Sequence, residues 1–439
     1  MEQLIQAVKS SSPYNIQGKV TNIIGLVIEG YCPEATVGSM CDITPLHGGD
    51  FVAAEVVGFK NSRALLMPLG ELRGLGPGSL INVLDNQATI RVGDAMLGRV
   101  LDALGNTIDQ GGKLELPWEM PLYSLPPGPM EREHITAPLD LGIKAINGFL
   151  TTGVGQRMAI MSGSGVGKST LLGMIAKNTR ADVNVIALIG ERGREVLEFI
   201  EHDLGREALK RSVLVVATSD QSPLLRMRGV FAATSIAEFF CNQGKDVLLL
   251  NDSVTRFAMA MREIGLAIGE PPTTKGYTPS VFARMPKLLE RAGNFKGKGS
   301  ITGLYTVLVE GDNMNEPITD TVRSILDGHI VLCRRLASRN HYPPIDLLQS
   351  TSRLMNVLVD LDHMKCCNRI REILATYQES EDLINIGAYN QGSNRNIDQA
   401  LRYIEPVNRL LRQDREECFS LKRTAEEMES IFQIASSKK

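Results

Sequence analysis

The sequence predicts an α/β protein in three parts: a small N-terminal β-barrel, a core with a mostly parallel sheet, and a helical C-terminal domain. Short β-rich runs alternate with turn residues from position 17 to about 85, which is typical of a small antiparallel barrel. Near-continuous apolar runs then alternate with helical stretches, which indicates a parallel sheet covered on both faces. After about residue 355 the apolar residues recur with a helical period.

Each element has an expected place in this order. Barrel strands are expected at residues 20–28, 41–43, 51–57 and 64–67. Core strands are expected at residues 158–161, 185–189, 213–217, 247–250, 303–309 and 329–332. Between residues 116 and 129 five prolines predict an extended connector without regular structure. From these changes of pattern we place the domains at residues 1–85, 86–355 and 356–439.

Composition excludes several classes of protein. The 439 residues are 43% hydrophobic and 22% charged, as in ordinary globular proteins. A formal net charge of −3 predicts no general attraction to nucleic acid or anionic lipid, and no apolar run approaches the roughly 18 residues that span a bilayer. Seven cysteines without metal-type spacing are expected to be reduced thiols. We therefore expect a cytoplasmic protein that reaches a membrane only through partners.

The most specific motif is Ser-Gly-Ser-Gly-Val-Gly-Lys-Ser-Thr at residues 162–170, with serine where the strict pattern begins with glycine. It lies between a predicted strand and a predicted helix. Closely spaced glycines let backbone N–H groups converge on an anion at the helix N-terminus. Lys168 would reach the terminal phosphates, and the Ser169 hydroxyl would hold a phosphate-bound Mg²⁺. The expected nucleotide-binding residues are Gly163, Ser164, Gly165, Val166, Gly167, Lys168, Ser169 and Thr170.

Carboxylates follow two further predicted strands, at the end where parallel sheets bind their ligands. Asp252 follows the run 247–250 and is expected to hold Mg²⁺ through water, opposite Ser169. Glu191 follows the run 185–189 and is the candidate for orienting and polarising the attacking water.

Three more side chains are candidates for the same site. Arg192 and Arg256 would absorb the charge that develops in the transition state, or would form ordinary surface ion pairs. Tyr342 precedes Pro343, so its backbone is extended and a loop presents its ring. That ring would stack on adenine or pack as a half-buried aromatic.

Longer segments around these residues resemble the type III secretion and flagellar protein-export ATPases, relatives of the rotary ATP synthase alpha and beta subunits. The resemblance rests on residues 163–170, 190–196, 252–257, 269–277, 305–312, 324–329, 343–346 and 350–353. It implies a RecA-like P-loop core between the barrel and the helical domain, with ATP and Mg²⁺ as cofactors. It also implies the roles of phosphate and metal residues for Lys168 and Ser169, of catalytic carboxylate for Glu191, of Walker B acid for Asp252 and of adenine contact for Tyr342.

The resemblance places Arg353 at the family's arginine finger, which reaches the site of the neighbouring subunit. Because Glu191 and Arg353 lie on the same chain, a single chain could supply both halves of every site, and a homohexamer is the expected assembly. The implied partners are export-gate and stalk components, secretion chaperones and protein substrates, at the inner membrane through the export apparatus. Residues 1–10 contain a short apolar stretch and are the candidate docking segment for a stator or regulatory protein.

The expected function is ATP hydrolysis at subunit interfaces of a ring, which releases chaperones from export substrates and unfolds them. A subunit of a rotary ATP synthase or ion-pumping ATPase is one alternative, since it shares the nucleotide chemistry. A ring-shaped RNA translocase is another, although 5% aromatic residues and a slightly negative charge do not favour it. A catalytically inactive ring subunit is disfavoured by the intact Lys168, Glu191, Asp252 and Arg353. The sequence does not distinguish flagellar export from an injectisome.

Overall fold

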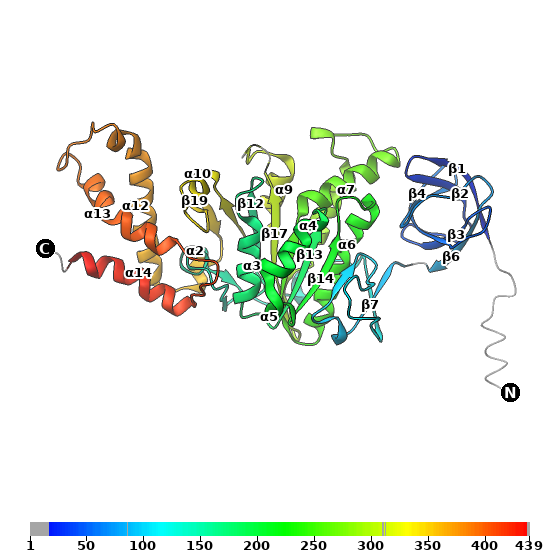
Figure 1. Cartoon of the computed structure of the whole chain (residues 1–439), viewed down its shortest axis with the longest axis horizontal. Coiled ribbons are helices and arrows are strands. Elements are labelled where there is room, and N and C mark those ends of the chain that lie inside the picture. Colours follow the sequence, from blue (N-terminus) through cyan, green and yellow to red (C-terminus); the bar gives the residue numbers. More distant parts are fainter. Residues whose placement is uncertain (1–16, 86, 310, 312, 437–439) are drawn as a thin grey trace.

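A computed structural model describes residues 17–85, 87–309, 311 and 313–436. The chain is elongated, with a β-barrel at one end, an α/β core in the middle and a helical region at the other end (Figure 1). This three-part architecture confirms the predicted fold class. The candidate docking segment at residues 1–10 lies outside the described residues.

The barrel closes six strands in the order β1-β2-β5-β4-β3-β6. Its strands are β1 (Gly18–Ile24), β2 (Val27–Tyr31), β3 (Met40–Thr44), β4 (Val52–Lys60), β5 (Arg63–Pro68) and β6 (Leu80–Asp85). The run predicted as one strand at residues 20–28 is a hairpin instead. Gly25 has φ of +57°, a left-handed conformation that glycine adopts readily, so the chain reverses between β1 and β2. Alternate side chains along β3 are buried inside the barrel, as period-two packing requires.

The proline-rich connector is more regular than its composition predicts. It contains β9 (Trp118–Pro121), which pairs antiparallel with β7 (Thr89–Val92), and the 3₁₀ turn η2 (Pro129–Glu131). Pro121 is the last residue of β9, a position where a missing N–H interrupts few ladder bonds. The prediction of a connector without regular structure was therefore wrong for this short ribbon.

The core sheet runs in the order β19-β18-β12-β17-β15-β13-β14-β8, and β16 pairs with β17. Its strands are β8 (Val100–Asp102), β12 (Arg157–Ser162), β13 (Val183–Ile189), β14 (Ser212–Ala217), β15 (Asp246–Asp252), β16 (Gly293–Asn294), β17 (Ser300–Leu308), β18 (Gly328–Leu332) and β19 (Ile345–Ser352). Apart from β16 and β19 the pairs are parallel. The six predicted core strands are all present. A further ribbon pairs β10 (Pro138–Leu139) with β11 (Thr152–Gly153).

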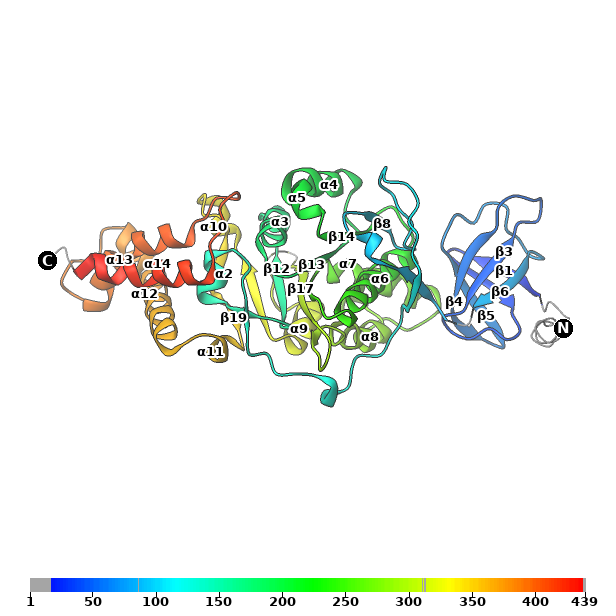
Figure 2. The same cartoon turned by 90° about the horizontal axis from the view of Figure 1, so that it is seen from below.

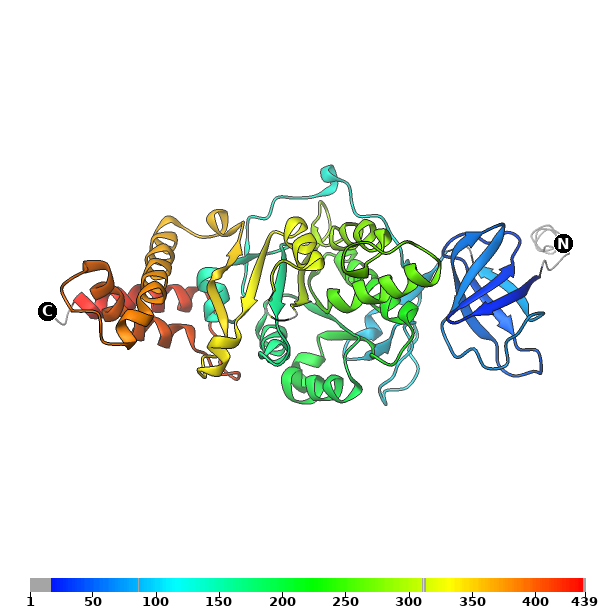
Figure 3. The same cartoon turned by 90° about the horizontal axis from the view of Figure 1, so that it is seen from above.

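Helices cover both faces of this sheet. One face carries α6 (Pro223–Asn242), α7 (Val254–Ala267), α8 (Pro279–Leu289) and α9 (Pro317–Ile325), and the other carries α3 (Lys168–Asn178), α4 (Gly193–Glu198) and α5 (Gly205–Leu209) (Figures 2 and 3). Other short or connecting elements are η1 (Asp94–Met96), α2 (Lys144–Phe149), the π-turn η3 (Phe199–Leu204), η4 (Thr274–Gly276) and α10 (Arg334–Ser338). The strands are nearly all buried, which explains their continuous apolar sequences.

The helical region consists of α11 (Met355–Leu358), α12 (Leu361–Asn385), α13 (Arg395–Leu411) and α14 (Leu421–Ser436). Ile370 and Ile373 on α12 are buried in the same apolar cluster as the α3 face of the sheet. Gln413, after α13, accepts a hydrogen bond from the Lys144 backbone N–H (2.8 Å) and donates one to the Gly142 carbonyl (2.8 Å). The helices are therefore continuous with the nucleotide-domain core.

A buried polar contact joins the barrel to the core. Glu55 on β4 pairs with Arg228 on α6 at 3.0 Å and accepts a 2.7 Å hydrogen bond from the Tyr123 hydroxyl in the connector. Burial raises the pKa of Glu55 despite the opposing effect of Arg228. All seven cysteines are free thiols, as predicted. Within the described part of the chain, no helix combines the length and apolar character needed to cross a membrane.

Candidate active site

The predicted phosphate loop has the expected conformation. Strand β12 ends at Ser162, the loop follows, and α3 begins at Lys168. Gly165 and Gly167 have φ of +73° and +98°, left-handed values that side chains disfavour, and Gly167 is the N-cap residue directly before the helix. Val166 is buried and anchors the loop in the apolar core. Strand, turn and helix therefore form the anion-binding arrangement that the sequence predicts.

Ser162 occupies the strand, so it needs no glycine conformation. It pairs in register with Leu308 and Leu332, and its carbonyl accepts a hydrogen bond from the Val309 N–H (2.9 Å). The serine that replaces the first glycine of the strict motif is thus at an extended backbone position, which any amino acid can adopt.

Three charged side chains meet at the carboxyl edge of the sheet. Lys168 Nζ lies 3.2 Å from Glu191 Oε1 and is also hydrogen-bonded to Asp252 Oδ1. The side chains of Lys168, Glu191 and Asp252 are 11%, 16% and 3% exposed. Thr306 on β17 donates a 2.7 Å hydrogen bond to Asp252 Oδ1 and fixes that carboxylate. The structure therefore brings the three predicted residues together, and it adds Thr306.

Burial and charge set the protonation of this cluster. Burial disfavours the charge on Lys168, but Asp252 and Glu191 more than compensate and raise its pKa. Burial also raises the pKa of Glu191, against the lowering effect of Lys168 and with a contribution from Asp252. A carboxylate with a raised pKa that touches the lysine predicted to bind phosphate is suited to polarise a water beside the terminal phosphate.

The two candidate arginines differ in position. Arg256 on α7 packs its aliphatic stem against Gly190, where an added Cβ would lie 3.0 Å from it, and its buried Nε has no hydrogen-bond partner among the described residues. It therefore lies beside the residue that precedes Glu191. Arg192 is 76% exposed and lies 3.5 Å from Glu195, which is the surface ion pair that the sequence left open.

The remaining loop and metal candidates surround the lysine. Ser169 is exposed at the start of α3, while the Thr170 hydroxyl binds the Asp203 carboxylate. The Tyr342 ring is half exposed and lies against the loop, since a Cβ built on Gly167 would be 3.8 Å from it. This position suits an aromatic that covers a base bound beyond the phosphates.

Arg334 is a loop contact that sequence reasoning missed. It opens α10, directly after β18, and its Nη2 donates a 3.0 Å hydrogen bond to the Ser164 carbonyl. Sequence reasoning also missed the contact of Thr306 with Asp252. Both contacts depend on β17 and β18 flanking β12, an order of strands that the sequence does not reveal.

Arg353 lies at the opposite edge of the sheet. Because β19 runs antiparallel to β18, Ser352 pairs with Gly328 at the start of β18, whereas the phosphate loop follows the end of β12. The length of β12 separates the two edges by about 20 Å. Arg353 therefore cannot reach the phosphate loop of its own chain.

The residues present fit a magnesium ion bound together with phosphates. The Ser169 hydroxyl and the Asp252 carboxylate supply oxygen ligands, which Mg²⁺ prefers. Within the described residues no three acidic, histidine or cysteine side chains form a metal cage of their own. Mg²⁺ sites commonly combine one or two carboxylates with substrate phosphates.

His341, next to Tyr342, gives a testable pH dependence. Burial, and then Arg412, lowers its pKa from 6.5 to about 4. Between these values the unfolded chain binds more protons than the folded chain, so stability falls as the pH falls from about 6.5 to about 4. The expected loss is about 3 kcal/mol. In chemical denaturation, His341→Gln should flatten this pH slope and the exposed His47→Gln should not; an unchanged slope in His341→Gln would contradict the assignment.

A RecA-like core with this loop, these carboxylates and a covering tyrosine defines the chain as a P-loop nucleoside triphosphatase. Residues 142–352 match the ATP synthase alpha/beta family nucleotide-binding domain, and residues 359–430 match the T3SS EscN ATPase C-terminal domain. The chain belongs to the family of type III secretion and flagellar protein-export ATPases, relatives of the ATP synthase alpha and beta subunits, and the predicted resemblance is confirmed.

Relatives of both kinds support this placement. The chain is 51% identical to the flagellum-specific ATP synthase of Bacillus subtilis over 95% of each chain. It is 46% identical to the type 3 secretion system ATPase of Xanthomonas euvesicatoria over 94% of this chain and 93% of that one. The structure of the assembled ATPase EscN from the enteropathogenic E. coli type III secretion system superposes with a TM-score of 0.90 at 46% identity, covering 94% and 99% of the two chains.

Proposed function

We propose that this chain hydrolyses ATP at the interfaces of a homohexameric ring and so energises protein export through a type III secretion or flagellar system. The observation that carries the proposal is the placement of Glu191 and Arg353 on opposite edges of one sheet. A finger that cannot reach its own phosphate loop can act only on a neighbouring copy. A ring of identical chains closes every such interface.

Within each site the roles follow from the contacts. Lys168 and the loop N–H groups bind the phosphates, Ser169 and Asp252 hold Mg²⁺, and Tyr342 covers the adenine. Bound Mg²⁺ would neutralise phosphate charge. Glu191 polarises the attacking water, with Arg256 beside it and Arg192 at the rim. Arg353 of the adjoining copy then stabilises the charge that develops on the transferred phosphoryl group.

The partners are proposed from the relatives. A solved structure at 44% identity and a TM-score of 0.87 shows the ATPase EscN in complex with its central stalk EscO, which supports a stalk protein as a partner here. We further propose export-gate components, secretion chaperones and unfolded substrates as partners, and a stator or regulatory protein at residues 1–10. The chain would then act in the cytoplasm, held at the inner membrane by the export apparatus.

Dilution tests the shared site directly. Hydrolysis per chain should rise steeply with protein concentration and follow the fraction of chains in rings, as measured by light scattering coupled to size-exclusion chromatography. Isolated chains should bind a fluorescent ATP analogue through their own loop but turn over little ATP. Isolated chains that hydrolyse ATP as fast as rings would refute the shared site.

A further inference from the structure

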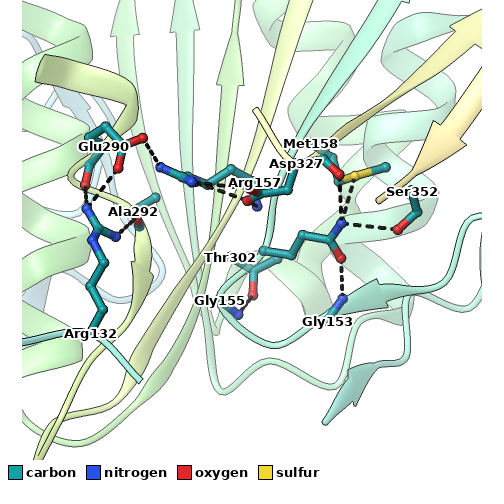
Figure 4. Close-up of polar contacts among 11 residues, drawn as sticks. Arg132, Gly153, Gly155, Arg157, Met158, Glu290, Ala292, Thr302, Asp327 and Ser352 are labelled. Carbon is teal, nitrogen blue, oxygen red and sulfur yellow. Dashed lines mark hydrogen bonds and ion pairs between the residues drawn. The ribbon is translucent and has the colours of Figure 1, made fainter. Parts of the chain in front are cut away.

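The amino edge of the core sheet contains a partly buried ion network that no nucleotide contact explains. Asp327 pairs with Arg157, Arg157 with Glu290 (2.6 Å), and Glu290 with Arg132 (3.0 Å) (Figure 4). The exposed fractions of Asp327 and Arg157 are 25% and 14%. Alternating charges that are shielded from water on a sheet edge hold their elements in a fixed geometry.

Asp327 is fastened to the first residue of β12 by several hydrogen bonds. Its carboxylate accepts from the Arg157 backbone N–H (3.1 Å), from Nε (3.1 Å) and from Nη2 (3.2 Å), and its own N–H donates to the Arg157 carbonyl (2.9 Å). Burial opposes the charge on Arg157, yet Asp327 and Glu290 together raise its pKa. The Arg157 guanidinium is therefore charged at neutral pH, and Asp327 holds it through two side-chain hydrogen bonds.

The main chain of Asp327 is hydrogen-bonded to the main chain of Arg353. The Arg353 N–H donates to the Asp327 carbonyl at 2.9 Å, which continues the pairing of Ser352 with Gly328. The approach is close, because a Cβ on Gly328 would lie 2.4 Å from the Thr351 carbonyl oxygen. The Arg353 guanidinium donates to the Arg323 carbonyl at 3.1 Å. The hydrogen bond to the Asp327 carbonyl therefore fixes the position of the Arg353 backbone, from which the side chain extends.

A second contact fixes the residue before Arg353. The Ser352 hydroxyl donates to the Thr151 carbonyl (2.9 Å) and accepts from Gln156 Nε2 (3.1 Å). Gln156 Nε2 also lies 3.3 Å from the Asp327 carbonyl, and Gln156 is fully buried. Figure 4 shows Ser352 and Asp327 on the two sides of this contact. Ser352 precedes Arg353 in the chain, and Asp327 accepts a hydrogen bond from the Arg353 N–H. Both residues are thus bound to Gln156, directly before β12.

We infer that Asp327, held by Arg157, is a positioning residue that aims Arg353 at the active site of the neighbouring chain. This inference rests on the proposed function, since it needs Arg353 to act between chains. A transition-state contact is sensitive to displacement, and a shift of about 1 Å far from the chemistry can cost roughly 100-fold in rate. The network stabilises the one backbone position from which the guanidinium extends.

The first test is Asp327→Asn, which keeps the size of the side chain and removes its charge. We expect kcat for ATP to fall roughly 10- to 100-fold while KM stays within about twofold. Asp109→Asn is the matched control: Asp109 pairs with Arg99, is 22% exposed, and lies beside β8 at the far end of the sheet. Its kcat should stay unchanged.

Hybrid rings then show on which chain the defect acts. Asp327→Asn chains keep their own cradle, whereas Glu191→Gln chains keep a correctly held finger. Co-expression with two different tags and tandem purification gives rings that contain both. If Asp327 positions the finger, these hybrids should be several-fold more active than either uniform ring. In them, Arg353 of a Glu191→Gln chain can act on the intact phosphate loop and Glu191 of a neighbouring Asp327→Asn chain.

The reference pair, Arg353→Ala with Glu191→Gln, separates the two ways of failing. Recovery in the reference pair without recovery in the Asp327→Asn pair would overturn the inference, since the defect would then act within the chain's own loop through β12. Absence of recovery in both would overturn the shared site itself. If Asp327→Asn does not form rings, the same pairing uses Ser352→Ala, and an unchanged kcat in that variant would contradict the inference.

Discussion

Glu191→Gln should keep nucleotide binding and lose turnover. The amide preserves the shape of the side chain, and Lys168 keeps its contact with Asp252, so the loop stays formed. The amide cannot polarise water or accept its proton, a role that contributes about 10²- to 10⁴-fold in rate. Phosphate release should fall by that factor, while the affinity for a fluorescent ATP analogue should change little.

Glu198→Gln provides the comparison for this variant. Glu198 is on the adjoining helix α4, is 50% exposed and pairs with Arg194 at the surface. Its substitution removes a neighbouring carboxylate without touching Lys168, and it should leave turnover within about twofold, since exposed pairs contribute little. Near-normal hydrolysis by Glu191→Gln would show that another group activates the water.

The electrostatics of the cluster suggest an order of events on binding. In the described chain the Lys168 ammonium is held by two carboxylates, one of which is also held by Thr306. A triphosphate must take over that ammonium, which leaves Glu191 without its cation. Removal of one partner of a buried pair is costly unless another charge replaces it. Asp252 and Ser169 would hold a Mg²⁺ ion here, and such a cation would add positive charge to the cluster.

The sequence could predict what is local along the chain. The phosphate loop needs left-handed glycines between one strand and one helix, and Gly165 and Gly167 fulfil that requirement within a few residues. Glu191 and Asp252 could be predicted because each lies at the carboxyl end of a buried parallel strand: Asp252 is the last residue of β15, and Glu191 is two residues beyond β13. Their meeting at Lys168 then follows from the common edge of such strands.

What depends on the order of strands could not be predicted. Thr306 and Arg334 reach the site because β17 and β18 flank β12, and only the assembled sheet brings them there. The antiparallel direction of β19, which moves Arg353 to the far edge, is equally hidden. The missed ribbon of β7 and β9 has a related cause, because its stability comes from pairing across 25 or more intervening residues rather than from local propensity.

Arg353→Ala should lower turnover at least as much as Glu191→Gln, and its effect should appear only in rings. Loss of an arginine finger costs about 10³- to 10⁵-fold in phosphoryl transfer, because the guanidinium stabilises charge that exists only in the transition state. ATP binding should therefore persist while kcat falls by about 10³-fold or more. Arg353→Lys should rescue little, since an ammonium lacks the planar fork.

The control is Arg339→Ala, which removes a 53% exposed arginine from an ion pair with Glu381. It should leave steady-state hydrolysis unchanged. Ring assembly of Arg353→Ala should also match the unaltered chain, because its side chain contacts only a carbonyl of its own chain at 3.1 Å among the described polar contacts. An Arg353→Ala ring that retains most of its kcat would mean that the site does not need this arginine of the neighbouring chain. The strand before it, β19, contains no arginine that could take its place.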